Sequence, residues 1–160
     1  MSEQTILTAE LRQEFESLCE RYPDRKAALL PILHRVQAIH GCLDRRAQQE
    51  VADFLGTSAV EVHGVVTFYP MFREKPIGKH LVSVCKNISC DLMGSDNLLA
   101  AIQRKFAVQP GETCTDPSFT LEAVQCQGAC GYGPMMVVDG HYHENLDAAK
   151  AVQILEDLKA

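Results

Sequence analysis

Three features are missing from this sequence of 160 residues, and each absence argues against a class of protein. Its longest apolar runs are only a few residues, so no segment is expected to span a membrane. It has no excess of basic residues: the formal net charge of −6 argues against broad electrostatic binding to nucleic acid or anionic lipid. Its start, MSEQTILTAELRQEFESLCERY, is charged and periodic and is not expected to be a secretory signal, and we therefore expect a cytoplasmic protein.

Cysteine, by contrast, is plentiful, with seven in the chain. In a reducing compartment, clustered cysteines are more often metal ligands or catalytic thiols than disulfides, and an odd number argues against a closed disulfide framework. Four of them form two pairs: Cys85 and Cys90 in CKNISC, and Cys126 and Cys130 in CQGAC. The other three stand alone and are interpreted as packed or partly exposed thiols: Cys19, Cys42 and Cys114.

The first half of the chain is predicted to be helical. Apolar residues recur at helical spacing in four segments: 8–22, 24–41, 44–56 and 58–72. Asp44 is the expected N-cap of the third segment, with Gly56 as its stop. Ser58 and Glu61 have the spacing of a capping box. Pro31 lies inside the second segment, which predicts a kink or a helix that starts late.

The second half is predicted to alternate strands and helices. After a connector over 73–80, the expected elements are a strand at 80–85, a helix at 95–106 capped by Ser95, a strand at 119–124, a hairpin at 135–143 that turns at 139–140, and a closing helix at 146–159. This order predicts a small sheet with helices packed on it, and an α+β protein as a whole.

Each cysteine pair follows directly after a predicted strand, so a sheet could bring both pairs to one edge. Four converging thiolates suit zinc or an iron–sulfur cluster. Gly128, Gly131 and Gly133 leave the main chain free to turn N–H groups toward an anionic cluster, and a helix beginning near Ser95 could face it. Three apolar residues could supply a dry wall: Met135, Met136 and Val137.

Other interpretations remain open at this level. On spacing alone, zinc is a serious competitor, and a zinc-stabilised interaction module is the alternative from a different functional class. Neither pair has the two intervening residues of a thioredoxin-type redox motif. The stretch RRAQQEVADFLGTSAVEVHGVV faintly suggests a helix-turn-helix, but the acidic balance argues against DNA binding. No glycine loop of the phosphate-binding kind opens a helix after a strand, so we expect no nucleotide site on this chain.

The cysteine spacing, the sequence VQCQGACGYGPMMVVDG and the helical segments RKAALLPILHRVQAIHGCL and VEVHGVVTFYPMF together resemble the small ferredoxin-like subunit of the NADH-oxidising module of respiratory complex I. The resemblance covers nearly the whole chain, from about Tyr22 to the C-terminal helix. It implies a helical N-terminal bundle at 1–75 and a thioredoxin-like ferredoxin domain at 76–160. It also implies one 2Fe-2S cluster, whose ligands would be Cys85, Cys90, Cys126 and Cys130.

The same resemblance implies a partner and a place in the cell. The partner is a flavoprotein subunit that carries FMN and the NADH site, and the cluster exchanges electrons with that flavin within a larger NADH:quinone oxidoreductase. We accordingly expect a cytoplasmic position, peripheral to the inner membrane through the complex. Related subunits of NAD-reducing hydrogenases and NAD-dependent formate dehydrogenases are an alternative. A cis peptide bond is expected before Pro134, which precedes a strand where thioredoxin-like folds often place one.

Overall fold

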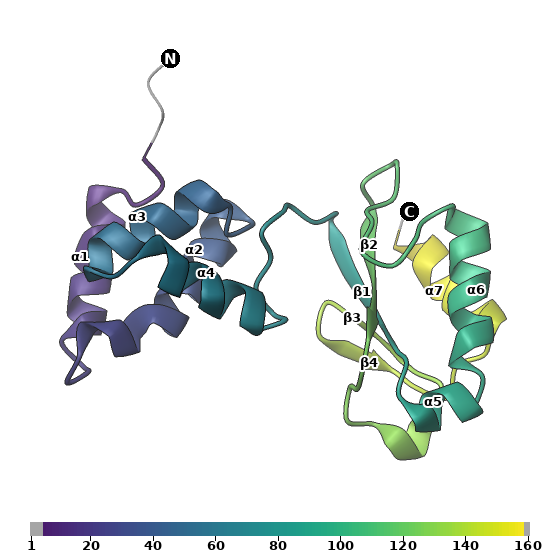
Figure 1. Ribbon diagram of the computed structural model, residues 1–160. Coiled ribbons are helices and arrows are strands. Elements are labelled where there is room, and N and C mark those ends of the chain that lie inside the picture. The colour runs from purple at the N-terminus through teal and green to yellow at the C-terminus, as the bar shows by residue number, and fades with distance from the viewer. Residues whose placement is uncertain (1–4, 159–160) are drawn as a thin grey trace. The chain divides into compact units, whose positions relative to one another are not determined.

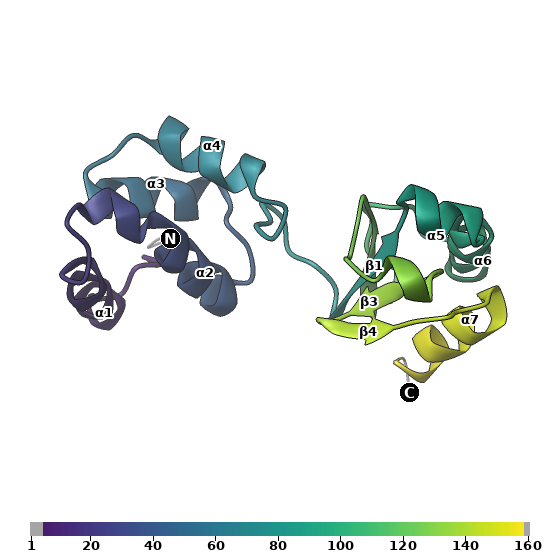
Figure 2. The ribbon, with the colours of Figure 1, turned by 90° about the horizontal axis from the view of Figure 1, so that it is seen from below.

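The computed structural model describes residues 5–158 of the chain, which contains both helices and a β-sheet (Figures 1 and 2). The chain divides into two compact units, residues 1–76 and residues 77–160. We call them unit 1 and unit 2 and describe each by itself. Over the described residues, no helix has both the length and the apolar character needed to cross a membrane.

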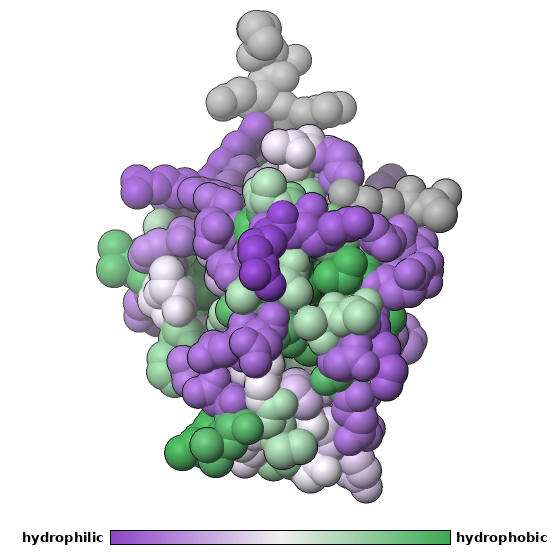
Figure 3. Space-filling view, turned by 90° about the vertical axis from the view of Figure 1, so that its right-hand side faces the viewer, coloured by the Kyte–Doolittle hydropathy of each residue, from purple (hydrophilic) through white to green (hydrophobic). Residues whose placement is uncertain are grey.

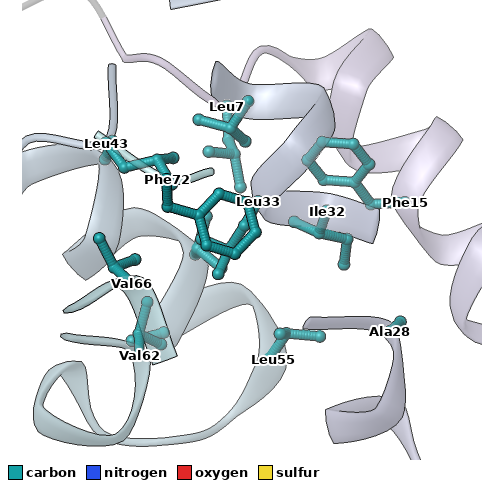
Figure 4. Packing of buried hydrophobic residues seen from close by; sticks show 14 of the residues in the cluster. Leu7, Phe15, Ala28, Ile32, Leu33, Leu43, Leu55, Val62, Val66 and Phe72 are labelled. Carbon is teal, nitrogen blue, oxygen red and sulfur yellow. The ribbon is translucent and has the colours of Figure 1, made fainter. Parts of the chain in front are cut away.

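Unit 1 is made of helices around one apolar core. Its elements are α1 (Ala9–Cys19), the 3-10 turn η1 (Arg25–Ala28), α2 (Leu29–His40), α3 (Arg45–Leu55) and α4 (Ala59–Phe68). Figure 4 shows the core side chains of these helices pointing toward one another, with Phe15 and Ile32 on one side and Val62 and Val66 on the other. The apolar residues that recur at helical spacing on each helix pack against the neighbouring helices. Such packing is the main source of helix stability in a protein.

The predicted helix ends of unit 1 agree with the structure at most positions. The Asp44 carboxylate accepts the N–H of Ala47 at the start of α3, and Gly56 ends that helix in the left-handed conformation. Ser58 and Glu61 form the capping box of α4. The fourth helix ends earlier than predicted, at Phe68, because Tyr69 precedes a proline and takes an extended conformation.

Proline also explains the start of α2. This helix begins at Leu29, so Pro31 lies in its first turn, where the missing N–H would have no partner within the helix. The prediction of a helix that starts late is therefore confirmed. Gly41 closes α2 in the left-handed conformation, and its N–H reaches the Gln37 carbonyl at 2.8 Å.

Unit 2 combines a four-stranded sheet with helices. Its elements are β1 (His80–Cys85), α5 (Ile88–Leu92), α6 (Ser95–Phe106), β2 (Phe119–Val124), the 3-10 turn η2 (Cys130–Tyr132), β3 (Met136–Val138), β4 (His141–His143) and α7 (Ala148–Asp157). The strand order is β2-β1-β3-β4, with β1 and β2 parallel and the other neighbours antiparallel. Figures 1 and 2 show α6 and α7 together on one face of the sheet, where they cover the apolar side chains of alternate strand residues.

Two details of unit 2 confirm predictions. Asp139 and Gly140 both have positive φ, at 48° and 84°, and form the turn between β3 and β4. The peptide bond between Gly133 and Pro134 is cis.

Two other details of unit 2 differ from what the sequence predicted. Ser95 is not the N-cap of α6: Gly94, with φ of 98°, holds that position, and Ser95 is a fully buried first residue of the helix. The short helix α5 was not expected, because five residues are too few to show an apolar period.

Candidate metal centre

The parallel pairing of β1 and β2 brings the two cysteine segments to one edge of the sheet. Cys85, the last residue of β1, is opposite Val124, the last residue of β2. The chain therefore leaves both strands at the same edge, and Cys126 follows β2 by two residues. The expectation that both segments emerge side by side is confirmed by this register.

The first pair of cysteines is buried in an apolar pocket. Cys85 is 2% exposed at the end of β1, and Cys90 is 1% exposed in the middle of α5. Three apolar neighbours complete a small core that is separate from the main core of unit 2: Met135, Val137 and, partly buried, Ala129. Met135 and Val137 thus form the dry wall expected from the sequence, whereas Met136 belongs to the main core on the other face of the sheet.

Burial changes the acidity of Cys90. Loss of solvent and the adjacent Cys85 thiol raise the pKa of the Cys90 thiol to about 11, and Cys130 nearby acts in the same direction. A hydrogen bond with the main chain of Met135 acts in the opposite direction. A thiol with this pKa is protonated at neutral pH, so a bound metal must displace its proton to gain a thiolate ligand.

The second pair lies on the surface, in the loop between β2 and β3. Cys126 and Cys130 are both exposed. Gly128, between them, has φ of 78°, and its N–H donates to the Cys126 sulfur at 3.3 Å. A side chain is strained at that φ, so glycine allows the chain to curl its N–H toward the thiol. The predicted role of glycine in this loop is confirmed at Gly128.

The tip of this loop is held by a tyrosine that the sequence did not indicate. The Tyr142 hydroxyl, on β4, donates to the Gln127 carbonyl at 2.9 Å. Alternation along β4 alone could not reveal this contact, because it depends on where the loop folds back.

Gly133 brings the second loop directly against the first pair. A Cβ atom added to Gly133 would lie 3.1 Å from the Cys90 sulfur and 3.3 Å from its Cα. A Cβ on Gly131 would meet no heavy atom within 4 Å. Of these two glycines, therefore, only Gly133, which packs closely on Cys90, must lack a side chain.

Further along, the main chain fixes the loop in place. Asn145 donates its N–H to the Tyr132 carbonyl at 2.8 Å, and Leu146 donates to the Pro134 carbonyl at 2.9 Å. At the start of β3, the Met135 carbonyl accepts the N–H of Cys85 at 3.3 Å. Both cysteine segments are thus tied to the same stretch, residues 132–135.

The donor set fits a two-iron cluster better than a single ion. Among residues 5–158, no three of the four sulfur atoms lie within 4.8 Å of one another. The four sulfurs around one tetrahedral zinc would all lie about 3.8 Å apart, given Zn–S bonds of ~2.3 Å. A 2Fe-2S cluster divides its four thiolates between two irons, so only the two sulfurs on the same iron need to lie that close together. The main-chain N–H of Gly128, which donates to the Cys126 sulfur, suits the negative charge of such a cluster.

The three lone cysteines are all buried, in agreement with their interpretation as packed thiols. The histidines of β4, His141 and His143, join no group of three close metal-ligand side chains within the described part of the chain. Among the described residues, the edge of the sheet is the place that carries two cysteine pairs.

Comparisons with known proteins agree with this site. A family model described as thioredoxin-like 2Fe-2S ferredoxin matches residues 15–159. The chain is 42% identical over 150 residues to a protein of Rhizobium meliloti that is named as an E subunit of NADH-quinone oxidoreductase, covering 94% of this chain and 89% of that one. It is 34% identical over 153 residues to the E subunit of NADH-quinone oxidoreductase from Escherichia coli, covering 96% of this chain and 92% of that one.

Other matches are with longer proteins. The corresponding E subunit from Mycobacterium bovis is 35% identical over 152 residues, which cover 95% of this chain and 60% of the mycobacterial protein. Among solved structures, an NAD+-reducing NiFe hydrogenase in the H2-reduced state matches with a TM-score of 0.71 and 23% identity. That match covers 82% of this chain but 22% of the hydrogenase chain, and it indicates a shared fold.

Proposed function

The chain belongs to the thioredoxin-like 2Fe-2S ferredoxin family, and from this premise we propose that Cys85, Cys90, Cys126 and Cys130 ligate one 2Fe-2S cluster. The observation that carries the proposal is the parallel register of β1 and β2, which delivers both cysteine segments to one edge. The bound cluster supplies one-electron transfer, and the chain's function is that of an electron-transfer subunit.

The protein's own part is to make a stable place for a negative cluster. With four thiolates the cluster carries about −2 when oxidised and about −3 when reduced, counted from ferric iron, sulfide and thiolate. The Gly128 N–H already points at the Cys126 sulfur, which lowers the cost of that charge. Reduction adds one negative charge to the cluster. Because Cys85 and Cys90 are buried, that charge is poorly solvated, which favours a low reduction potential.

The partner in this proposal is a flavoprotein subunit that carries FMN and the NADH site. An apolar surface surrounds the cysteine edge: Ile88 and Leu92 on α5 are 72% and 82% exposed, and Met93 and Tyr132 are exposed beside them. Figure 3 shows green, hydrophobic residues at the lower end of the space-filling view, the end of unit 2 where Figure 1 places α5. Exposed apolar residues gathered at one place are typical of a protein interface.

The names of the similar proteins support a proposal about the complex in which this chain works. The proteins that are 34% and 42% identical are named as subunits of NADH-quinone oxidoreductase, so we place this chain in an enzyme complex of that kind. Hydride chemistry belongs to the partner, and this chain passes single electrons. We further propose a cytoplasmic position at the inner membrane through the complex, with a helical bundle at 1–75 as the first domain and the ferredoxin domain at 76–160.

The test is a measurement of iron and acid-labile sulfide in the purified full chain, with EPR after dithionite reduction. About two irons and two sulfides per chain, with a rhombic signal in the reduced sample, are expected for one 2Fe-2S cluster. The same signal should vanish in Cys126→Ala but persist in Cys114→Ala, which removes a buried thiol of the same unit that is outside the site. A colourless protein that carries zinc, expressed with iron available, would contradict the cluster.

The partner is tested separately by isolating the chain from its native cells under mild conditions. We expect an FMN-containing subunit to accompany it and quinone reduction by NADH in the whole assembly. Replacing Leu92 by Asp should release the flavoprotein without loss of iron. Recovery with a hydrogenase subunit and no quinone-reducing activity would instead support the related diaphorase assembly.

A further inference from the structure

The turn between α2 and α3 gathers three side chains of different metal-ligand types, away from the four-cysteine edge. His40, Cys42 and Asp44 each offer one ligand atom, and these atoms all lie within 4.8 Å of one another. We propose that this turn is a second metal site, which binds a divalent ion of the zinc class through the His40 imidazole, the Cys42 sulfur and the Asp44 carboxylate. The proposal is independent of the cluster, because all three residues belong to unit 1.

The main chain of this turn is fixed at both ends and in the middle. Gly41 ends α2, and Asp44 caps α3. Between them, Leu43 is fully buried and its N–H donates to the Arg73 carbonyl at 2.6 Å. The Leu43 carbonyl accepts the buried Gln48 side-chain amide at 2.6 Å. A site on such a turn is already organised before the ion arrives, so little conformational freedom is lost on binding.

The three side chains leave suitable atoms available. One carboxylate oxygen of Asp44 accepts the Ala47 N–H at 2.8 Å, and the other lies 3.4 Å from His40 Nε2. Cys42 is 5% exposed, whereas His40 and Asp44 have side chains that are 33% and 45% exposed. An ion can thus reach the site from solvent through the exposed imidazole and carboxylate and bind the buried thiol as well.

A simple ion pair explains only part of this arrangement. A surface pair of His40 and Asp44 is a weak interaction that exists only when the histidine is protonated. It does not account for a third ligand atom at the same point, where a hydrogen bond with the Asp44 main chain holds the Cys42 sulfur. Coordination uses all three atoms.

The donor set indicates which ions fit. One nitrogen, one sulfur and one oxygen suit zinc, with cobalt and cadmium as spectroscopic substitutes, and do not suit the all-oxygen shell of magnesium or calcium. A thiolate and a carboxylate together neutralise a divalent charge. Zn–ligand bonds of about 2.0–2.3 Å require the three atoms to draw in to roughly 3.3–3.8 Å from one another, which small side-chain rotations provide.

A fourth position would remain open to a small ligand. An open depression of about 440 Å³ borders Asp44, and its other lining residues are Arg45, Arg46, Lys75 and the acidic Glu74. The excess of basic over acidic residues favours a negatively charged fourth ligand such as hydroxide or chloride. Three protein ligands and one exchangeable ligand make the site a reversible one rather than a closed structural zinc site.

The experiment uses the full chain with its iron in place. The protein is incubated with zinc, excess metal is removed, and zinc, iron and sulfide are measured per chain. Zinc K-edge X-ray absorption then reports the neighbours of zinc alone, whatever iron is present. We expect one zinc per chain, bound to one sulfur and otherwise to nitrogen and oxygen, with iron and sulfide unchanged.

Three variants make the test specific. Cys42→Ser should remove the sulfur neighbour and weaken zinc binding by at least about tenfold to a hundredfold. Asp44→Asn should weaken it as well, while the amide oxygen still caps α3. Cys19→Ser, at another buried lone thiol of unit 1, should leave zinc binding unchanged.

Four results would overturn the proposal. They are no retained zinc, zinc without a sulfur neighbour, zinc with several sulfur neighbours and matching loss of iron, or equal zinc affinity in Cys42→Ser and the unmodified chain. The last would show that the buried thiol takes no part. The cluster proposal has its own readout, iron and sulfide, and three of these results leave it unaffected. The remaining one, zinc with matching loss of iron, would locate the zinc at the four-cysteine edge.

Discussion

The two cysteine pairs at the edge of unit 2 differ in how the protein holds them. Cys85 and Cys90 are buried in a small apolar core, on a strand end and a helix, whereas Cys126 and Cys130 are exposed on a loop. The first pair is positioned by packing and the second by hydrogen bonds of the main chain. The ligands of one proposed cluster can therefore differ in burial and in how they are held. We expect the two pairs to respond differently to substitution.

The largest effect is expected when serine replaces one cysteine of each pair in turn. Both Cys90→Ser and Cys126→Ser lose a thiolate, but position 90 lies in a tightly packed, buried pocket and position 126 lies on an exposed loop. The loop can adjust so that the shorter hydroxyl or a water molecule replaces the missing sulfur, whereas the packed pocket around position 90 cannot. We expect Cys126→Ser to retain more iron than Cys90→Ser. Equal iron contents would mean that burial does not distinguish the pairs.

The second prediction concerns thiol reactivity after the cluster has been removed. Because the pKa of Cys90 is raised to about 11, about one molecule in a thousand carries its thiolate at pH 8. Its alkylation should be slow at pH 8 and should increase about tenfold per pH unit toward pH 11. The exposed Cys126 and Cys130 should be labelled first, as peptide mass spectrometry can determine. Early labelling of Cys90 at pH 8 would contradict the buried pocket.

A smaller effect is expected at Gly133, where the loop that carries the second pair packs against Cys90. Gly133→Val would push its side chain against the Cys90 sulfur, and overpacking of this kind costs ~1–3 kcal/mol. The variant should lose iron to a chelator faster and show a shifted EPR spectrum. Gly131→Val is the matched control, since a Cβ there meets no atom within 4 Å. If both variants behaved alike, the contact with Cys90 would not be the cause.

The smallest effect is expected at the hydrogen bond that supports the exposed loop. Tyr142→Phe removes the donor to the Gln127 carbonyl and should cost ~0.5–1.5 kcal/mol of local stability. Hydrogen exchange at residues 125–130 should accelerate, while exchange in α5 should not change. Tyr132→Phe is the control, because Tyr132 holds the loop through its main chain. Faster exchange in α5 would show that the two pairs are not supported independently.

Much of the architecture around the site could be predicted from the sequence. The run HLVSVC contains two β-branched valines and is bounded by Pro76 and Gly78 upstream, and β1 occupies those six residues. Aspartate and glycine at 139–140 predicted the hairpin turn, because that turn needs positive φ at both positions. These features depend on residues close together in the chain.

What the sequence did not reveal depends on contacts between distant residues. CKNISC and CQGAC are similarly polar, so nothing local indicates that one pair is buried and the other exposed. The need for glycine at Gly133 arises only when Cys90 lies against it. Ser95 was wrongly predicted as a cap because the preference for serine at an N-cap is local, while its burial is a tertiary effect.

The alternation of β1 has a consequence for how this protein can change through evolution. Val82 and Val84 point to the helices and Cys85 to the opposite face, so one inserted residue in the strand would exchange the two faces. It would misplace the core and the first sulfur together. A gain or loss of one residue inside this strand should therefore be eliminated by selection.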